Sequence, residues 1–371
     1  MPEQQKIRVA IVFGGQSAEH EISILSARNV LAALDTSRFE PVLIGIDKSG
    51  HWLLQDSQRL LASARDPRLV RIESGVPAPV PSPLSTSTTA AVGRIDVIFP
   101  VLHGTLGEDG AVQGLFEVAG IPYVGAGVLG SAIGMDKDVM KRLLRDAGIP
   151  VADFRTLRRD HFDADPRRAC DALAELGLPL FTKPANAGSS VGIRKVKDAS
   201  GVADAVRYAF EFDTKVIAEA AVTGREIELA VLGGNPPTVS VAGEIIVEHP
   251  DGFYSYDAKY IDEHGARLEL PARLTADEQS RAQAMALHAF DVLECEGMAR
   301  VDLFLKPDGG LLVNEINTIP GFTAISMYPK LWSLSGVAPT ELVTRLIELA
   351  LDRGRQRAAI QRSIRLPIVD S

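Results

Sequence analysis

The sequence has few of the features that mark secreted, membrane-spanning or nucleic-acid-binding proteins. Its two cysteines, Cys170 and Cys295, give neither a disulfide framework nor the spacing of a zinc site, which favours a reducing compartment. No apolar run approaches the length of a signal-peptide core or a membrane span. The net charge of −9 argues against general binding to nucleic acids or anionic membranes. We therefore expect a cytoplasmic protein.

The sequence also lacks an internal repeat of fixed period. Its 371 residues, 46% hydrophobic and 23% charged, are typical of a soluble globular protein with two or three domains. Apolar runs and helical periodicity predict an opening β-α-β pattern, which is typical of an open α/β sheet. The expected strands are 7–13, 40–46, 95–100 and 121–123, and the expected helices run to about Leu34 and over 110–119. The Pro-, Ser- and Thr-rich segment 74–89 is expected to be a surface loop.

The pattern changes near Leu129, where we expect a second domain. An amphipathic helix at 135–147 is followed by strands at 151–156, 180–183 and 215–220 and a helix at 200–212. From Glu226 onward alternating segments dominate, and two long helices at 276–293 and 338–353 are expected to cover the resulting sheet. We place the domains at residues 1–128, 129–222 and 223–371, with α/β character overall and α+β character in the C-terminal half.

The segment from Ala299 to Asn317, ARVDLFLKPDGGLLVNEIN, is the most informative part of the chain. It predicts two strands joined by a tight Pro-Asp-Gly-Gly turn. If Lys306 pairs with Leu311 across that turn, Asp302 lies opposite Glu315. The alternate residues should then point into a core: Val301, Leu303, Leu305, Leu312 and Ile316.

The same register places Arg300 opposite Asn317, so four polar groups share one face of the hairpin. Two carboxylates, Asp302 and Glu315, beside an amide and a fixed cation are typical of a site for a hard metal ion. Mg²⁺ prefers oxygen ligands and usually leaves room for phosphates. Taken alone, the alternation is explained equally well by an ordinary hairpin with one face in solvent and one face in the core.

A Gly- and Ser-rich loop, KPANAGSSVG, follows directly after a strand that ends in Lys183. Small residues let backbone N–H groups approach phosphate oxygens, and hydroxyls add further donors. The loop matches neither the Walker A pattern nor GxGxxG, and a flexible hairpin tip is the alternative. Nearby, Glu219 and Glu226 are placed to accept hydrogen bonds from a ribose, although a surface acidic pair is the simpler interpretation.

Three further loops carry candidate groups. Residues 251–261, DGFYSYDAKYI, combine three tyrosines with a lysine and suit a lid that excludes water, or a loop pinned by its tyrosines. The segment 14–21, GGQSAEHE, lies at a strand-to-helix turn, where Glu19 could bind an ammonium group. His103 begins HGTLGEDG after another strand end, which is a better position for a functional histidine than most.

Taken together, these segments resemble the D-alanine–D-alanine ligases, which have the ATP-grasp fold. HGTLGEDGAVQG, MDK, KPANAGSSVG, YDAKY, RVDLF and NEINTIPGFT occur in the same order as in that family, from Gly14 to about Met327. The divergent parts are 55–89 and the tail beyond Arg355. The resemblance implies a three-domain architecture with an N-terminal substrate-binding domain and ATP held between the central and C-terminal domains.

The resemblance also implies a nucleotide site and a metal site. The residues that match the family's ATP contacts are Lys137, Lys183, Ser189, Ser190, Glu219, Glu226 and the lid residue Lys259. Asp302, Glu315 and Asn317 match the ligands of two Mg²⁺ ions, with Mn²⁺ as an alternative metal. Two positions depart from the usual pattern: Ala220 on the adenine hinge and Ala187 in the Gly/Ser loop.

The remaining matches concern D-alanine, the small-molecule substrate. Glu19, Ser189 and Tyr260 resemble a linked trio beside the first D-alanine. Arg300 and the backbone of Gly321 would stabilise the tetrahedral intermediate. The second carboxylate would be held by Ser326 and the backbone of Met327, with His103 lining the same pocket. Related enzymes are usually homodimers, which is the expectation here.

The implied reaction joins two D-alanines for peptidoglycan precursors through a D-alanyl phosphate. Three alternatives remain open: a D-alanine–D-lactate ligase, another ATP-grasp carboxylate–amine ligase, and a nucleotide-binding regulator without catalysis. The pair Tyr256 and Tyr260 favours the dipeptide over the depsipeptide. The segments GGQSAEHE and HGTLGEDG, which lie outside the ATP site, disfavour other carboxylate–amine ligases, and the presence of Arg300 and its hairpin partners disfavours the regulator.

Overall fold

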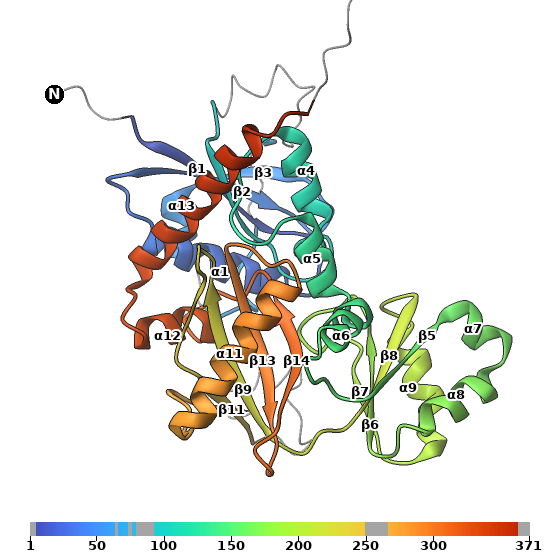
Figure 1. Ribbon diagram of the computed structural model, residues 1–371. Helices are drawn as coiled ribbons and strands as arrows, with labels where there is room; N and C mark the ends of the chain where they lie inside the picture. Colours follow the sequence, from blue (N-terminus) through green and yellow to red (C-terminus); the bar gives the residue numbers. More distant parts are fainter. Residues whose placement is uncertain (1–4, 64–65, 73–75, 79–92, 249–265, 363–371) are drawn as a thin grey trace, which may run out of the picture.

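The computed structural model describes residues 5–63, 66–72, 76–78, 93–248 and 266–362, and these form three β-sheets with flanking helices (Figure 1). We call them the N-terminal sheet, the small sheet and the large sheet. In the view of Figure 1 the N-terminal sheet lies at the top, the large sheet below it, and the small sheet to the right. The described helices include none with the length and hydrophobicity needed to cross a membrane.

The N-terminal sheet has the strand order β3-β2-β1-β4, in which β1 runs parallel to β2 and β4 while β3 is antiparallel. The apolar run of β1 is buried on both faces, as expected for a central parallel strand. The elements of this part are β1 (Ile7–Gly14), α1 (His20–Ala33), β2 (Phe39–Ile46), β3 (Trp52–Gln55), α2 (Ser57–Ala62), β4 (Val97–Val101) and α4 (Ala111–Ala119). The loops after β1 and β4 therefore leave the same edge of the sheet, which brings Glu19 near His103 and Glu108.

The small sheet is antiparallel, with the order β5-β8-β6-β7. Two helices, α5 and α6, lead into it, and α9 packs on β6 and β7. The elements are α5 (Val128–Met135), α6 (Lys137–Asp146), β5 (Phe154–Arg158), α7 (Arg159–Ala164), α8 (Pro166–Ala174), β6 (Leu180–Pro184), β7 (Arg194–Val196), the 3-10 turn η1 (Ala199–Gly201), α9 (Val202–Ala209) and β8 (Lys215–Ala220). The strands β6 and β8 agree with the prediction, whereas α5, α7 and α8 were missed.

The large sheet is also antiparallel, with the order β12-β11-β9-β13-β14 and β10 beside β9. Its strands are β9 (Arg225–Leu232), β10 (Thr238–Val239), β11 (Gly243–Val247), β12 (Ala266–Glu269), β13 (Met298–Leu305) and β14 (Leu311–Asn317), and its helices are α11 (Ala276–Val292), α12 (Met327–Leu334) and α13 (Pro339–Ala358). A capping box starts α11, where the Thr275 hydroxyl accepts from the Glu278 N–H at 3.2 Å and Glu278 accepts from the Thr275 N–H at 2.8 Å.

Two elements differ from the predictions. The helix α13 does not cover the large sheet but packs on α1, β4 and α12, while α11 covers β9, β13 and β14 as expected (Figure 1). Helical periodicity predicts which face of a helix is buried, but it does not predict which element packs against that face. The expected strand at 121–123 is reduced to one bridge, between Ile98 and Tyr123. Most of the expected loop 74–89 and the whole expected lid 251–261 lie outside the described residues.

Gly130 lies where α5 contacts the backbone that follows α11. A Cβ at this position would clash with the backbone carbonyl oxygen of Glu294, so the backbone would have to shift. We predict that Gly130→Ala lowers the free energy of unfolding by roughly 1–3 kcal/mol, since overpacking has costs of that size. Calorimetric melting temperatures check this. The control is Gly114→Ala on α4, where nothing lies within 4 Å of the new Cβ; equal melting temperatures for both variants would contradict the prediction.

Candidate active site

A cavity of about 510 Å³ opens between the small sheet and the large sheet. Its size is in the range of ligand pockets in other proteins. The small sheet contributes Lys183 and Glu219, and the large sheet contributes Glu226, Asp302 and Glu315. The cavity therefore contains many of the residues that the sequence singled out, from segments far apart in the chain.

At the end of the β13–β14 hairpin away from the turn, the strand pairing is as predicted. Arg300 pairs with Asn317 and Asp302 pairs with Glu315. The pairing nearer the turn is different, because Leu305 and not Lys306 lies opposite Leu311.

A β-bulge accounts for the difference. Between the pairs Asp302–Glu315 and Leu303–Val313, Asn314 has no opposite residue. The extra residue reverses which side chains of β14 face the core, so the prediction for Leu312 is wrong: Leu311 and Val313 are buried and Leu312 is half-buried.

Arg300 holds the carboxylates of this face together. Its Nε and Nη2 each lie 2.7 Å from an oxygen of Asp302, and its Nε lies 3.0 Å from Oε2 of Glu228. Burial alone would lower the pKa of Arg300, but Asp302 and Glu228 outweigh it and raise that pKa well above its usual value. The guanidinium is therefore a permanent cation. Glu228 was not predicted, although the alternation in REIELAVL places it on the same face as Glu226.

The donors on this face suit a hard cation. Asp302 and Glu315 supply carboxylate oxygens, and Asn317 supplies an amide whose Nδ2 donates to Asp302 at 3.1 Å, leaving its oxygen directed elsewhere. Such an all-oxygen set fits Mg²⁺ better than a softer metal. Within the described ranges, no group of three His, Cys, Asp or Glu side chains is gathered for a metal, so any ion at this face would use the amide or ligand oxygens as well.

Lysines cluster on the opposite side of the cavity. Lys183 lies 2.8 Å from Oε2 of Glu219, and Lys141 lies 3.3 Å from Oε1 of the same carboxylate. Burial would raise the pKa of Glu219, but the two lysines lower it to about 2. The same carboxylate raises the pKa of Lys183 against the opposing effect of burial. Lys141 was missed, although it lies four residues after Lys137 on one helix face.

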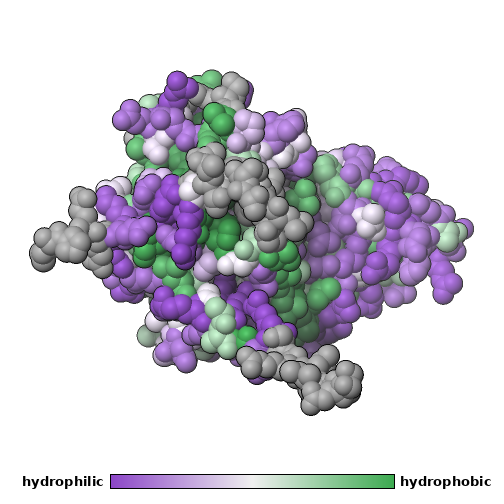
Figure 2. Space-filling model, turned by 90° about the horizontal axis from the view of Figure 1, so that it is seen from above, coloured by the Kyte–Doolittle hydropathy of each residue, from purple (hydrophilic) through white to green (hydrophobic). Residues whose placement is uncertain are grey.

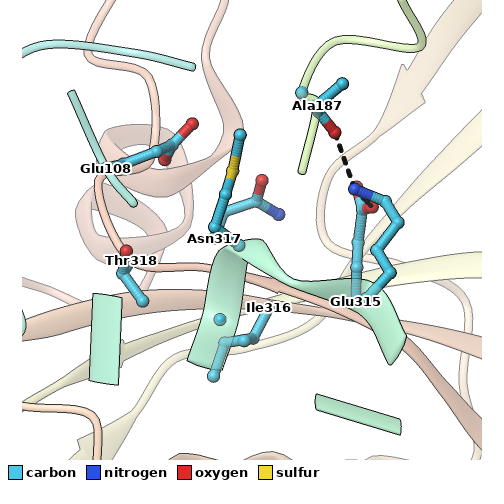
Figure 3. A pocket seen from close by; sticks show the side chains of 10 residues that line it. Glu108, Ala187, Glu315, Ile316, Asn317 and Thr318 are labelled. Atoms are coloured by element: carbon cyan, nitrogen blue, oxygen red, sulfur yellow. Dashed lines mark hydrogen bonds and ion pairs between the residues drawn. The ribbon is translucent and has the colours of Figure 1, made fainter. Parts of the chain in front are cut away.

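Lys137 links the two sides of the cavity at one end. Its ammonium donates to the carbonyl oxygen of Ala187 at 2.7 Å and lies 3.7 Å from Oε2 of Glu315. Figure 3 shows the neighbouring small cavity, with Glu108, Asn317 and Glu315 arranged around it. Lys137 thus lies between the Gly/Ser loop and the carboxylates of the hairpin.

Two serines of the Gly/Ser loop adopt an unfavourable backbone conformation. Ser189 and Ser190 have φ angles of 47° and 60°, in the left-handed region that side chains disfavour. Both serines line the cavity. The Ser189 hydroxyl donates to Oε1 of Glu19, so the loop reaches across to the N-terminal sheet. Glu19 and Ser189, two of the three residues in the trio that the family resemblance implies, are therefore in contact.

Glu108 is a second buried carboxyl group beside Glu19. It accepts from the Gly104 N–H at 2.8 Å and is 8% exposed. Burial, and then the negative charge of Glu19, raise the pKa of Glu108 to about 8. Sequence reasoning singled out HGTLGEDG without selecting this residue, and its burial could not be read from a Gly-rich loop.

His103 lies behind the loop that contains Gly321. Its Nδ1 lies 3.1 Å from the Ile319 carbonyl oxygen and its Nε2 lies 3.1 Å from the Ser26 hydroxyl, which also accepts from the Phe322 N–H at 3.2 Å. Burial lowers the pKa of His103, so the ring is neutral, with a proton on Nδ1 for the carbonyl. Both ring nitrogens are occupied by the protein, and the histidine braces residues 319–322.

The other predicted substrate contacts follow this loop. A Cβ at Gly321 would lie 2.8 Å from Oγ of Ser326, so the two positions are adjacent. The Ser326 hydroxyl accepts from the Thr323 N–H at 3.0 Å, and Met327 is the first residue of α12. Two predicted residues, Lys259 and Tyr260, lie outside the described part of the chain.

The two antiparallel sheets, with lysines on one and carboxylates on the other, define an ATP-grasp ligase. The family models for the N-terminus and the C-terminus of "D-ala D-ala ligase" match residues 8–126 and 143–348. The chain belongs to the D-alanine–D-alanine ligase family. The predicted family and fold class are thereby confirmed.

Individual relatives agree over nearly the whole chain. D-alanine–D-alanine ligase A of Chromobacterium violaceum is 53% identical, covering 96% of this chain and 99% of its own, and the enzyme of the same name from Escherichia coli K12 is 51% identical, covering 94% and 97%. The solved D-alanine-D-alanine ligase from Coxiella burnetii has a TM-score of 0.81 at 38% identity, covering 95% of this chain and 97% of that one. VanG D-Ala:D-Ser ligase from Enterococcus faecalis has a TM-score of 0.80 at 37% identity, covering 93% and 100%.

The raised pKa of Glu108 predicts a pH-dependent stability. Because the folded protein keeps this proton up to about pH 8 while the unfolded chain loses it near the ordinary carboxyl pKa of 4.5, stability falls as pH rises between those values. We predict that the melting temperature of the ligand-free protein falls less between pH 5 and 8.5 in Glu108→Gln than in the wild type.

Glu117→Gln is the control for this comparison. Burial would raise the pKa of Glu117, but Tyr123 and Arg357 lower it, so the group stays ionised across the whole interval. Its substitution should leave the pH slope as in the wild type. Identical slopes for Glu108→Gln and the wild type would contradict a protonated Glu108.

Proposed function

We propose that this protein joins two D-alanines to D-alanyl-D-alanine with the conversion of ATP to ADP and phosphate, for peptidoglycan precursors. The observation that carries the proposal is the near full-length identity of 51–53% to D-alanine–D-alanine ligases, in a chain that keeps the charged cavity. A carboxylate is a poor electrophile, so the first D-alanine is converted to an acyl phosphate. The amine of the second then attacks the carbonyl carbon, and phosphate leaves.

The first step is phosphoryl transfer, in which positioning and charge neutralisation dominate catalysis. Lys137, Lys183, Ser190 and Glu226 line the cavity. The two lysines and Ser190 would contact phosphate oxygens, and Glu226 would accept hydrogen bonds from the ribose. Glu219 would lie at the adenine hinge, and Lys259 would reach the γ-phosphate from the lid.

A divalent ion belongs to this step. Asp302, Glu315 and Asn317 would hold two Mg²⁺ ions, with Mn²⁺ as a substitute. The ions, when bound, supply positive charge to the phosphates. The all-oxygen donor set of the hairpin supports this assignment.

The second step develops a negative oxygen on a tetrahedral carbon. Arg300 is the permanent cation at that position, and the Gly321 N–H is the second donor. One donor of this kind typically contributes roughly 3–4 kcal/mol to the stabilisation of the transition state. Glu19, Ser189 and Tyr260 would orient the first D-alanine. Ser326 and the backbone of Met327 would hold the carboxylate of the second, in a pocket lined by the neutral His103.

The identity of the second substrate is the point at which related enzymes differ. The solved VanG enzyme is named a D-Ala:D-Ser ligase, and it shares 37% identity with this chain. The curated relatives named D-alanine–D-alanine ligase are closer in sequence, at 51–53%. The identity to the curated D-alanine–D-alanine ligases supports D-alanine as the acceptor, and the sequence pair Tyr256 and Tyr260 favours it over D-lactate.

The test is phosphate release from ATP and Mg²⁺, with chromatography of the product. We expect turnover with D-alanine alone, a product of D-alanyl-D-alanine, and no turnover with L-alanine. Mixed products in the presence of equal D-serine or D-lactate would show a relaxed acceptor site. A requirement for D-serine or D-lactate would overturn the proposal, and ATP binding without any turnover would point to a regulator.

The metal assignment predicts the effect of removing one ligand. Glu315→Ala should lower kcat by roughly a hundredfold or more, since losses of that size follow the removal of one transition-state contact. The fold should persist, because Glu315 is half-buried on the polar face of the hairpin. The control is Asp308→Ala in the turn of the same hairpin, where the carboxylate is exposed and pairs with Lys306. Near-normal turnover of Glu315→Ala would refute the assignment.

We further propose a cytoplasmic homodimer that needs neither a membrane nor nucleic acid. Two free cysteines and a net charge of −9 support this setting. From above, hydrophobic residues gather beside the hydrophilic lobe of the small sheet (Figure 2). On α4 and α5, Val118 and Leu129 are exposed, and a second copy could cover such side chains. Light scattering of the purified protein tests the dimer.

A further inference from the structure

Lys141 is the most buried charged residue near the cavity, yet it does not line it. Its side chain is fully enclosed on α6, and the cavity wall is formed instead by its two partners, Glu219 and Asn314. A buried ammonium is costly unless it is paired and hydrogen-bonded. Both conditions are met from behind the wall, so Lys141 acts on the site through other residues.

The first partner is the carboxylate that also holds Lys183. Glu219 is 3% exposed and lies between the two ammonium groups, 3.3 Å from Lys141 and 2.8 Å from Lys183. Only Lys183 can reach the cavity. If Lys141 were absent, Glu219 would depend on Lys183 alone for compensation, and a buried carboxylate left unpaired is strongly unfavourable.

The second partner is the backbone of the β-bulge. The Lys141 ammonium donates to the carbonyl oxygen of Asn314 at 3.1 Å, and Asn314 is the residue without an opposite partner in the β13–β14 ladder. A carbonyl that a bulge removes from the ladder needs another donor when it is buried. Lys141 supplies it, next to Glu315.

We propose that Lys141 is a positioning residue that acts as the standing counterion of Glu219, so that Lys183 can turn from Glu219 to the phosphates of a bound nucleotide. The same ammonium fixes the bulge that directs Glu315 into the cavity and ties the small sheet to the large sheet. The inference rests on the proposed nucleotide site and adds a residue that does not touch the nucleotide.

The physical consequence concerns affinity for the nucleotide more than the chemical step. With Lys141 present, the two ammonium groups and one carboxylate leave a net positive charge for phosphates. With a neutral residue in its place, Lys183 is retained by Glu219, and binding ATP must break that pair. The affinity for ATP should therefore fall. The affinity for D-alanine, which is bound at the other end of the site, should not change.

The test is Lys141→Gln, which removes the charge but keeps an N–H donor for the Asn314 carbonyl. We expect the KM for ATP and the calorimetric Kd of MgATP to rise roughly tenfold, a usual size for coupled buried charges. The KM for D-alanine should stay within about twofold. The matched control is Arg142→Gln, the next residue on α6, whose guanidinium is partly exposed and pairs with Asp138.

Repeating the Lys141 substitution in a Glu219→Gln variant separates charge compensation from simple loss of structure. In Glu219→Gln there is no carboxylate to compensate, so adding Lys141→Gln should change MgATP affinity by less than about twofold. Equal losses in both backgrounds, or a lower melting temperature with unchanged ATP affinity, would overturn the inference. If Lys141→Gln alone fails to fold, the comparison of Glu219→Gln with the double variant still decides, because neither of these two variants contains a Glu219 carboxylate that needs a counterion.

The outcome is distinguishable from a failure of the proposed function. Wild-type protein that binds MgATP but does not join D-alanines would refute the ligase activity. The MgATP affinities of the Lys141 and Glu219 variants would still test the counterion. Normal ligase activity with an unaltered Kd in Lys141→Gln would refute the counterion alone.

Discussion

One buried carboxylate, Glu219, determines how charge is distributed around the cavity. It stays ionised away from water because two lysines flank it, and the wall formed by the small sheet is therefore positive overall. The opposite wall carries more carboxylates than cations, with Arg300 holding Asp302 and Glu228. A polyphosphate and its metal ions fit between such walls, because the anion meets lysines on one side and the cations meet oxygens on the other.

The pairing of Arg300 with Asn317 and of Asp302 with Glu315 could be predicted because alternation along a strand depends on sequence alone. The strands β1 and β8 could be predicted from their short apolar runs, which likewise depend on sequence alone. Glu19 and Ser189 were brought together by the family resemblance, since 170 residues separate them and no local pattern relates them.

Other features depend on tertiary contacts that no local pattern encodes. The bulge at Asn314 is stabilised by Lys141 from another helix, so the turn sequence alone gave the wrong pairing for Lys306. The helix α13 shows a clear apolar face, but the choice between the large sheet and α1 depends on the space left in the assembled protein. The proton of Glu108 depends on burial and on Glu19, which approaches from a different strand end.

The hydrogen bonds that hold the backbone around Gly321 limit which parts of the chain can be exchanged between relatives. Ser26, Asn29 and His103 belong to the N-terminal part of the chain, yet they hold the backbone of 319–322: Asn29 donates to the Phe322 carbonyl oxygen at 2.8 Å, and His103 and Ser26 hold Ile319 and Phe322. The two family regions are thus not interchangeable modules. A chimera that takes its first 126 residues from a relative would keep the loop at 319–322 in place only if that donor supplies the same three side chains, so recombination within the family is constrained at this contact between the two family regions.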